Sequence, residues 1–317
     1  LNSTLGFNQS ELAHISDIIS DSDGSHFTID STEIISFGDI NLLKQNSQIE
    51  IRNSVLSDMG KIITHADNSA VYIENSSLSN TEEIITAESN SPLTIVNSVI
   101  EDVPVMRTQG INSPISVHRS DLNLSSIESQ GNNSSIDLLH SKITNAPSDA
   151  IKTEGQSDIT ANYSVISNAF GVGLYSSRYS FLNHLTVFSN SDYGIINGQA
   201  GLSYIKNSVV GLNNNSFDSQ ISGTLETSYS HTYGDPSFSD HEGHLEVYSP
   251  GVDGAEPWET DTNMPMGLGT FRADMGAYGG PQNDYWGGTP VPIGNATILS
   301  VEDKPQDQGS NVGVVFD

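Results

Sequence analysis

The chain has 317 residues, and its 39 acidic side chains against only 11 Lys and Arg give a formal net charge of −28. A field of that sign repels phosphate backbones and anionic lipid headgroups, so we expect no nucleic-acid partner. The sequence has no run of about 18 apolar residues, so we expect no membrane insertion. The absence of cysteine excludes disulfides and thiolate metal sites.

Only 35% of the residues are apolar and 7% are aromatic, which is little for one thick core. Ile, Leu and Val nevertheless recur at regular spacing, so the sequence is not that of a disordered chain. Both observations favour a thin core that is filled repeat by repeat.

From the N-terminal region onward, the sequence repeats every 22 residues. The stretches NSQIEIRNSVLSD from Asn46, NSAVYIENSSLSN from Asn68 and NSPLTIVNSVIED from Asn90 align without gaps. One column of hydroxyl residues recurs in steps of 21 to 23: Ser10, Thr32, Ser54, Ser76, Ser98, Ser120, Ser141, Ser164, Thr186 and Ser208. Two residues later an apolar column follows: Leu12, Ile34, Leu56, Leu78, Ile100, Leu122, Ile143, Ile166, Phe188 and Val210. Ten matches in register predict a repeat architecture.

Within each repeat, apolar and polar residues alternate before the hydroxyl column, as at Ile49 and Ile51, and again after it, as at Ile62 and Thr64. Strict alternation is typical of half-buried strands. Turn-forming residues separate the two stretches in a column: Asp58, Asn80, Asp102, Asn145, Asn168 and Asn190. For residues 1–222 we therefore predict an all-β, right-handed parallel β-helix of about ten coils, or rungs, of 22 residues, each with two strands and turns. Stacked polar columns are expected to hydrogen-bond along its axis.

Beyond about Gly223 the columns fade, and residues 223–290 are predicted to form an irregular cap of the same domain. The cap region reads GDPSFSDHEGHLEVYSPGVDGAEP from Gly234 and GTFRADMGAYGGP from Gly269. It resembles the closing segment of bacterial secreted right-handed β-helix proteins of the pectate-lyase-like architecture. The matching positions are Asp235, Pro236, Phe238, His244, Leu245, Ser249, Pro250, Asp253, Asp274, Gly276, Ala277 and Tyr278. The resemblance implies an extracellular or cell-surface location in bacteria.

The last segment, residues 291–317, is predicted to be a linker and the first strand of a following module. Within it, VEDKPQDQGSNVGVVF over residues 301–316 resembles the opening strand that follows such helices in longer secreted proteins. The resemblance implies that this chain is one module of a larger bacterial polypeptide.

Two outward faces of the predicted helix carry candidate binding or catalytic groups. On the later strand of successive rungs, Arg107, Glu128, Lys152 and Tyr175 should stack about 4.8 Å apart, and Glu154 lies two residues after Lys152. This set could bind an anionic sugar, with Lys152 or Tyr175 carrying a proton. A ladder of alternating charges that stabilises one sheet face is the alternative interpretation.

On the earlier strand the predicted outward column is Arg52, Glu74, Val96, His118, Leu139, Asn162, His184 and Lys206. His184, beside Lys206 and Tyr204, is the best candidate for a general base on this face. An exposed histidine with no catalytic role is the alternative.

In the cap, Asp253, Glu256, Asp261 and Asp274 offer the hard oxygen ligands that Ca²⁺ prefers. Turn and capping roles explain the same residues nearly as well. Calcium is the one cofactor that we consider; none other is expected. The sequence lacks the G-x-S-x-G, H-E-x-x-H and G-x-x-x-x-G-K-[ST] motifs, which disfavours hydrolase, zinc-protease and nucleotide-binding functions.

The evenness of the rungs favours a non-catalytic extracellular module that serves as a rigid spacer, an adhesin or a glycan-binding surface. Polysaccharide lyases of this fold tend to carry long insertions that build a groove. A lyase or glycoside hydrolase acting on an anionic polysaccharide, through either face, remains an alternative. A self-assembling filament subunit is another, since a rod with strand edges could be a monomer or associate end to end or laterally.

Overall fold

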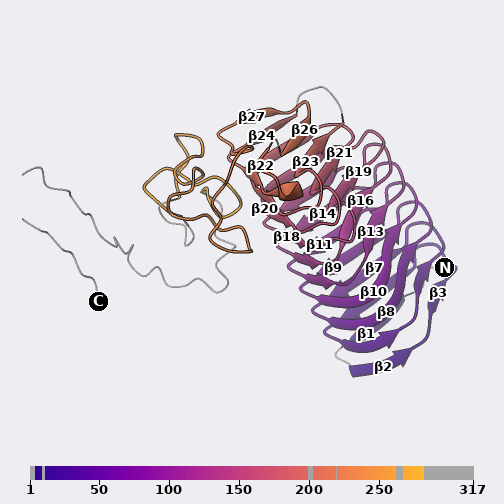
Figure 1. The fold of residues 1–317 in the computed structure, drawn as a ribbon. Coiled ribbons are helices and arrows are strands. Elements are labelled where there is room, and N and C mark those ends of the chain that lie inside the picture. Colours follow the sequence, from indigo (N-terminus) through magenta and orange to yellow (C-terminus); the bar gives the residue numbers. More distant parts are fainter. Residues whose placement is uncertain (1–3, 9–10, 199–202, 219, 262–266, 282–317) are drawn as a thin grey trace, which may run out of the picture.

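A computed structural model describes residues 4–8, 11–198, 203–218, 220–261 and 267–281. It is an all-β parallel β-helix of about ten coils of roughly 22 residues, which confirms the predicted fold class. Figure 1 shows the rungs stacked along one axis from the N-terminal strands to β27 (Glu226–Ser228). Within the described residues, no helix is long and apolar enough to cross a membrane.

Each rung contributes to three columns of strands that pair in parallel, where the sequence predicted two. The first strand column contains β1 (Thr4–Asn8), β4 (His26–Asp30), β7 (Gln48–Arg52), β9 (Ala70–Glu74), β11 (Leu93–Val96), β14 (Ile115–His118), β17 (Ile136–Leu139), β20 (Ile159–Ser167), β22 (Ser180–Phe188), β24 (Tyr204–Lys206) and β27. The second contains β2 (Glu11–Ile15), β5 (Glu33–Phe37), β8 (Val55–Thr64), β10 (Ser77–Thr86), β12 (Val99–Glu101), β15 (Asp121–Asn123), β18 (Lys142–Thr144), the later halves of β20 and β22, and β25 (Val209–Gly211).

The third strand column contains β3 (Ile18–Ser20), β6 (Ile40–Leu42), the later halves of β8 and β10, β13 (Val105–Thr108), β16 (Ser126–Ser129), β19 (Ile151–Thr153), β21 (Leu174–Ser176), β23 (Ile195–Asn197) and β26 (Ile221–Gly223). A short 3₁₀ helix, η1, spans Asn213–Asn215. The apolar column of the sequence lies in the second strand column, and most residues of the hydroxyl column lie directly before it; the sequence did not distinguish this column as a separate strand.

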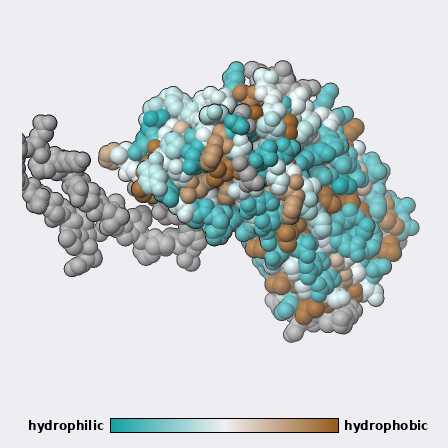
Figure 2. Space-filling model, in the orientation of Figure 1, coloured by the Kyte–Doolittle hydropathy of each residue, from teal (hydrophilic) through white to brown (hydrophobic). Residues whose placement is uncertain are grey.

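The core is a narrow stack of inward side chains, one layer per rung. In β7 the burial alternates, so Ile49 and Ile51 face inward between Phe27 and Ile29 on one side and Val71 and Ile73 on the other. Strands buried on their inner face alone produce this alternation. The outward surface seen in Figure 2 is mostly hydrophilic, with scattered hydrophobic patches.

A hydrogen-bonded ladder of hydroxyls joins successive rungs, as the sequence predicted. The backbone N–H of Ser76 donates to Ser98 Oγ over 3.2 Å, and Ser98 N–H donates to Ser120 Oγ over 3.1 Å. Each hydroxyl in turn donates to a carbonyl two residues earlier, as Ser98 does to Val96. The ladder thereby satisfies buried polar groups that a thin core could not cover.

One predicted register is wrong by one residue, in the rung of β22. Leu185, not Thr186, continues the hydroxyl column, because Ser164 pairs with Leu185 and Ser208 Oγ accepts from Leu185 N–H. Val187 accordingly replaces Phe188 in the apolar column. The step from Ser164 to Leu185 is 21 residues and the step from Leu185 to Ser208 is 23 residues. Because the two deviations cancel, two steps of 22 residues lead to the same Ser208 and hide the shift.

Between the first and second strand columns, each rung whose turn is described bends at one residue with φ near +50°, and we call these positions the αL turn column. It contains Ser31, Asn53, Asn75, Asn97, Arg119, His140, Tyr163, His184, Asn207 and Tyr229. Asn is the side chain that best tolerates this left-handed conformation, apart from glycine. From Arg119 to His184 the column holds bulky residues in place of Asn, in the half of the rod that carries the cap, and Asn returns at Asn207.

The cap, residues 234–281 without 262–266, is irregular and packs on the flank of β20, β22 and β25 (Figure 1). An antiparallel bridge joins Phe238 to Leu245, and Phe238 lies 4.9 Å from Phe188 between ring centroids. Gly243 has a φ of +87°, and a Cβ there would lie 2.6 Å from the Phe188 ring, so only glycine fits. The predicted linker over residues 291–317 lies outside the described residues.

Candidate functional site

The predicted charged face on the third strand column is assembled as expected. Arg107, Glu128, Lys152 and Tyr175 pair in register on β13, β16, β19 and β21. Arg107 Nε lies 2.8 Å from Glu128 Oε2, and Lys152 Nζ lies 2.9 Å from Glu154 Oε1. Half-exposed pairs of this kind contribute about 0–1 kcal/mol to stability.

Lys152 is held in its charged form on this face. The hydrogen bond to Glu154 raises the pKa of Lys152 above its usual value, and this effect outweighs burial, which lowers the pKa. A lysine with a raised pKa keeps its proton at neutral pH, and the proton-carrying role predicted for Lys152 or Tyr175 stays a prediction. Ligand binding by this face stays a prediction.

His184 does not face outward, so its predicted exposed position is wrong, while a role as a general base stays a prediction. Because the β22 rung is one residue shorter, Asn183 takes the outward position beside Lys206, and His184 falls in the αL turn column. Its side chain is 0% exposed beneath the cap. Nε2 lies 2.6 Å from Glu259 Oε2, Nδ1 lies 3.3 Å from the Gly276 carbonyl oxygen, and the ring stacks on Tyr163 at 4.8 Å.

Next to this buried histidine lies an open groove of about 370 Å³ between the first strand column and the cap. We call it the cap groove. Its lining comes from β20 (Thr160, Asn162), β22 (Phe181, Asn183), β24 (Tyr204, Lys206) and the cap (Glu256, Glu259). Phe181 and Tyr204 stand on neighbouring rungs with their ring centroids 5.3 Å apart, and Tyr204 is 39% exposed.

The polar groups of the cap groove are fixed by contacts behind them. Lys206 Nζ lies 3.1 Å from Glu256 Oε1, which brings two of the predicted site residues together. Glu259 Oε2 lies 2.6 Å from His184 Nε2 and accepts a hydrogen bond from Asn207 Nδ2 at 3.2 Å. The same amide group of Asn207 contacts Asn183 Oδ1 at 3.0 Å. Groups positioned in this way bind a ligand with little loss of side-chain entropy.

This arrangement of aromatic faces, amides and a lysine–glutamate pair suits a ligand with both an apolar face and many hydroxyls. Aromatic rings offer apolar area with only two side-chain torsions to restrict. Carboxylates and amide oxygens accept from hydroxyl groups, and amide N–H groups donate to them. The sequence singled out Lys206 and Glu256 separately; it could not bring them together, because the position of the cap does not follow from the repeat.

Three of the four predicted calcium ligands lie close together in the cap, but backbone amides occupy their oxygens. Asp253 N–H donates to Asp274 Oδ1, Leu268 N–H donates to Asp274 Oδ2, and Asp274 N–H donates to Asp261 Oδ2. Asp253 itself accepts from Thr270. Among the described residues, no group of three or more His, Asp or Glu side chains is placed to hold a metal ion.

Burial strongly perturbs this carboxylate cluster. It raises the pKa of Asp274 from 3.8 to about 7, although hydrogen bonds from the Asp253 and Leu268 amides lower it. Burial raises the pKa of Asp261 as well. Taking a carboxylate out of water disfavours its charged form and so raises its pKa.

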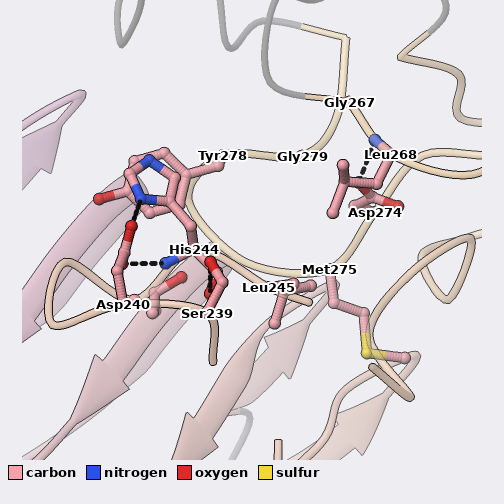
Figure 3. A pocket seen from close by; sticks show the side chains of 12 residues that line it. Ser239, Asp240, His244, Leu245, Gly267, Leu268, Asp274, Met275, Tyr278 and Gly279 are labelled. Atoms are coloured by element: carbon pink, nitrogen blue, oxygen red, sulfur yellow. Dashed lines mark hydrogen bonds and ion pairs between the residues drawn. The ribbon is translucent and has the colours of Figure 1, made fainter. Parts of the chain in front are cut away.

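A second hollow of about 420 Å³, which we call the cap cavity, lies between the cap loops and Thr186 of β22. Figure 3 shows His244 paired with Asp240 and lying over the Tyr278 ring at its edge. In the sequence, His244 is marked only as a position of the closing segment. A signal was present in the spacing, since Asp240 precedes His244 by four residues around a turn-forming glycine.

No described protein family, curated protein or solved structure matches the chain.

Proposed function

We propose that this chain is a non-catalytic, extracellular β-helix module of a larger bacterial protein, and that it binds a neutral glycan in the cap groove. The observation that carries the proposal is the pair of rings formed by the partly buried Phe181 and the exposed Tyr204, beside the fixed polar groups of Lys206, Glu256 and Glu259. Sugars present apolar ring faces and peripheral hydroxyls, which match these two kinds of group.

Charge supports a neutral ligand over an anionic one. The whole chain carries a net charge of −28, and the one lysine of the groove is already paired with Glu256. A uronate polymer would approach against this field. The cationic side chains of the other candidate face, Arg107 and Lys152, are likewise paired with carboxylates.

The stiffness of the rod supports the role of a spacer that presents the groove. About ten rungs at about 4.8 Å each span about 48 Å, and every rung is tied to the next by strand pairing and the hydroxyl ladder. The secreted, pectate-lyase-like assignment rests on the resemblance of the closing segment. Its Phe238 and Tyr278 pack on Val165 and Phe188 of the rod, and its His244 stacks on Tyr278.

A glycan array followed by calorimetry with a neutral oligosaccharide tests the proposal. Tyr204→Ala should weaken binding about tenfold, which corresponds to about 1.4 kcal/mol of lost contact with the ring. Tyr72→Ala is the matched control, because Tyr72 occupies the same outward column on a distant rung, away from the groove. Equal losses in the two variants, or preferential binding of oligogalacturonate, would contradict the proposal.

The enzymatic alternatives are tested with the same protein. Incubation with neutral and uronate polysaccharides, read by reducing ends and by the absorbance of unsaturated products, should give no product. Turnover that disappears in Lys206→Ala would replace the binding role with a lyase or hydrolase acting in this groove.

A further inference from the structure

The cap cavity shares no lining residue with the cap groove and has a different chemistry. Its walls are Thr186 of β22, the turn from Ser239 to Leu245, and cap residues between Gly267 and Gly279 (Figure 3). Leu245, Leu268 and Met275 supply an apolar lining. At about 420 Å³ the cavity falls within the size range of small-molecule sites.

The turn that carries Asp240 and His244 fixes the imidazole ring in the wall of this cavity. Asp240 Oδ1 accepts from the backbone N–H groups of Glu242 and His244, at 2.9 and 3.2 Å, which closes the turn. The other oxygen, Oδ2, lies 2.6 Å from His244 Nδ1. The Tyr278 ring stacks on the imidazole at 4.0 Å and holds its plane.

This geometry determines the tautomer of the neutral imidazole. The hydrogen bonds from His244 and Glu242 lower the pKa of Asp240, although burial, the largest single effect, raises it. The carboxylate therefore accepts, so Nδ1 carries the proton and Nε2 presents a lone pair. Nε2 is buried and has no hydrogen-bond partner among the described residues. A buried acceptor without a donor is costly, and a ligand that donates to it recovers that cost.

The charged groups around the cavity determine which charge a bound ligand should carry. Asp240 and Asp274 are part of the lining, and neither Lys nor Arg is. Both oxygens of Asp274 already accept from backbone amides, and Ser239 Oγ lies 3.2 Å from the His244 carbonyl oxygen to which it donates. The lining thus offers one free acceptor, negative charge and apolar surface. It offers few groups for a ligand with many hydroxyls.

We propose that the cap cavity binds a primary alkylammonium group, such as the end of a lysine side chain. The ammonium donates to His244 Nε2 near the Asp240 carboxylate, and its hydrocarbon stem packs against Leu245, Leu268 and Met275. A cation between negative charges and an apolar wall gains from both, as long amphipathic side chains do at protein surfaces.

Titration calorimetry at pH 8 with n-butylammonium tests this site in the whole chain. We expect a dissociation constant on the order of 1 mM, the strength that five non-hydrogen atoms can supply. Butanol, butyrate and glucosamine should bind at least tenfold more weakly. Equal binding of butanol, tighter binding of glucosamine, or no binding of butylammonium would overturn the proposal.

Asp240→Asn is the sharpest variant. The Asn side-chain oxygen keeps the turn, while its amide donates to Nδ1 and moves the imidazole proton to Nε2, which then repels an ammonium. Binding should fall at least tenfold, whereas Asp235→Asn should have no effect, because Asp235 closes a similar turn outside the cavity. Unchanged affinity in Asp240→Asn would refute the proposal.

His244→Phe, which keeps a ring against Tyr278 and removes both nitrogens, gives the same test if Asp240→Asn does not fold. Wild-type affinity in His244→Phe would also refute the site. Tyr204→Ala, the cap-groove variant, should bind butylammonium normally. The amine site and the glycan groove therefore succeed or fail independently.

Discussion

Replacing His184 with Asn should detach the cap from the rod while leaving the rungs intact. Asn is chosen because it occupies the αL turn column at Asn53, Asn75, Asn97 and Asn207, so the backbone at φ +50° is retained. The substitution removes the imidazole that lies between the rod and the cap. What is lost is therefore the contact of the ring and not the turn.

The magnitude follows from two contacts and one compensating backbone effect. The ring stacks on Tyr163 at 4.8 Å and 8°, worth about 0.5–1.5 kcal/mol. The 2.6 Å contact with Glu259 involves a carboxylate, worth about 1.5–3 kcal/mol. The better fit of Asn to the left-handed backbone offsets up to about 1 kcal/mol. We expect a net loss of about 1–4 kcal/mol in the attachment of the cap.

Hydrogen exchange read by mass spectrometry separates the cap from the rod. A loss of about 3 kcal/mol corresponds to about a 150-fold fall in protection, and it should be confined to cap peptides within residues 234–281. Asn75→His is the reciprocal control, since it places histidine in the same turn on an uncapped rung and should cost at most about 1 kcal/mol. A fall of less than fivefold in the cap, or an equal fall in rungs 48–139, would refute the reasoning.

Two further substitutions test the ladder and the carboxylate cluster. Ser98→Ala leaves the buried Ser76 N–H without its acceptor, so it should lower the free energy of unfolding in urea by about 1–3 kcal/mol. Ser79→Ala is the control, because the Ser79 hydroxyl makes no hydrogen bond within the described residues; it should change the free energy of unfolding by less than about 0.5 kcal/mol. Because burial raises the pKa of Asp274 from 3.8 to about 7, the folded state between these pH values binds a proton that the unfolded state has released. Protonation of Asp274 therefore stabilises the folded state by an amount on the order of 4 kcal/mol. This stabilisation is fully present below pH 3.8 and is lost as the pH rises through 7. Asp274→Asn should flatten the decline of stability between pH 4 and pH 7, and an unchanged slope would show that another group causes it.

The rungs could be predicted from sequence because the same alternation of apolar and polar residues recurs in every repeat. Ile49, Ile51 and their counterparts alternate with polar residues, and strand pairing in the structure follows that alternation directly. The hydroxyl column was readable for the same reason, since a stacked Ser satisfies its neighbour only in register. The number of strands per rung was less accessible, because β12 and β15 have only three residues each.

The error at β22 shows where repetition misleads. Thr186 supplies a hydroxyl one residue after the true position, so it drew the alignment away from Leu185. The displacement moved His184 from a buried turn to an apparently exposed strand. A competing signal existed in β22 itself, because Phe188 is too large for the apolar column that Ile166 and Val210 define, and it packs instead against the cap.

The position of the cap can be inferred from the part of the αL turn column where bulky side chains replace Asn. A left-handed conformation costs a residue such as His or Tyr about 1–2 kcal/mol, yet His140, Tyr163 and His184 adopt it on three successive rungs. A rung that no cap covers gains nothing from a bulky residue at this turn, and the earlier rungs accordingly carry Asn there. The cost is offset only if the rings are buried against something, and all three are. A run of bulky residues in a turn column of asparagines therefore predicts a docked segment, and both candidate ligand sites of this chain lie beside that contact.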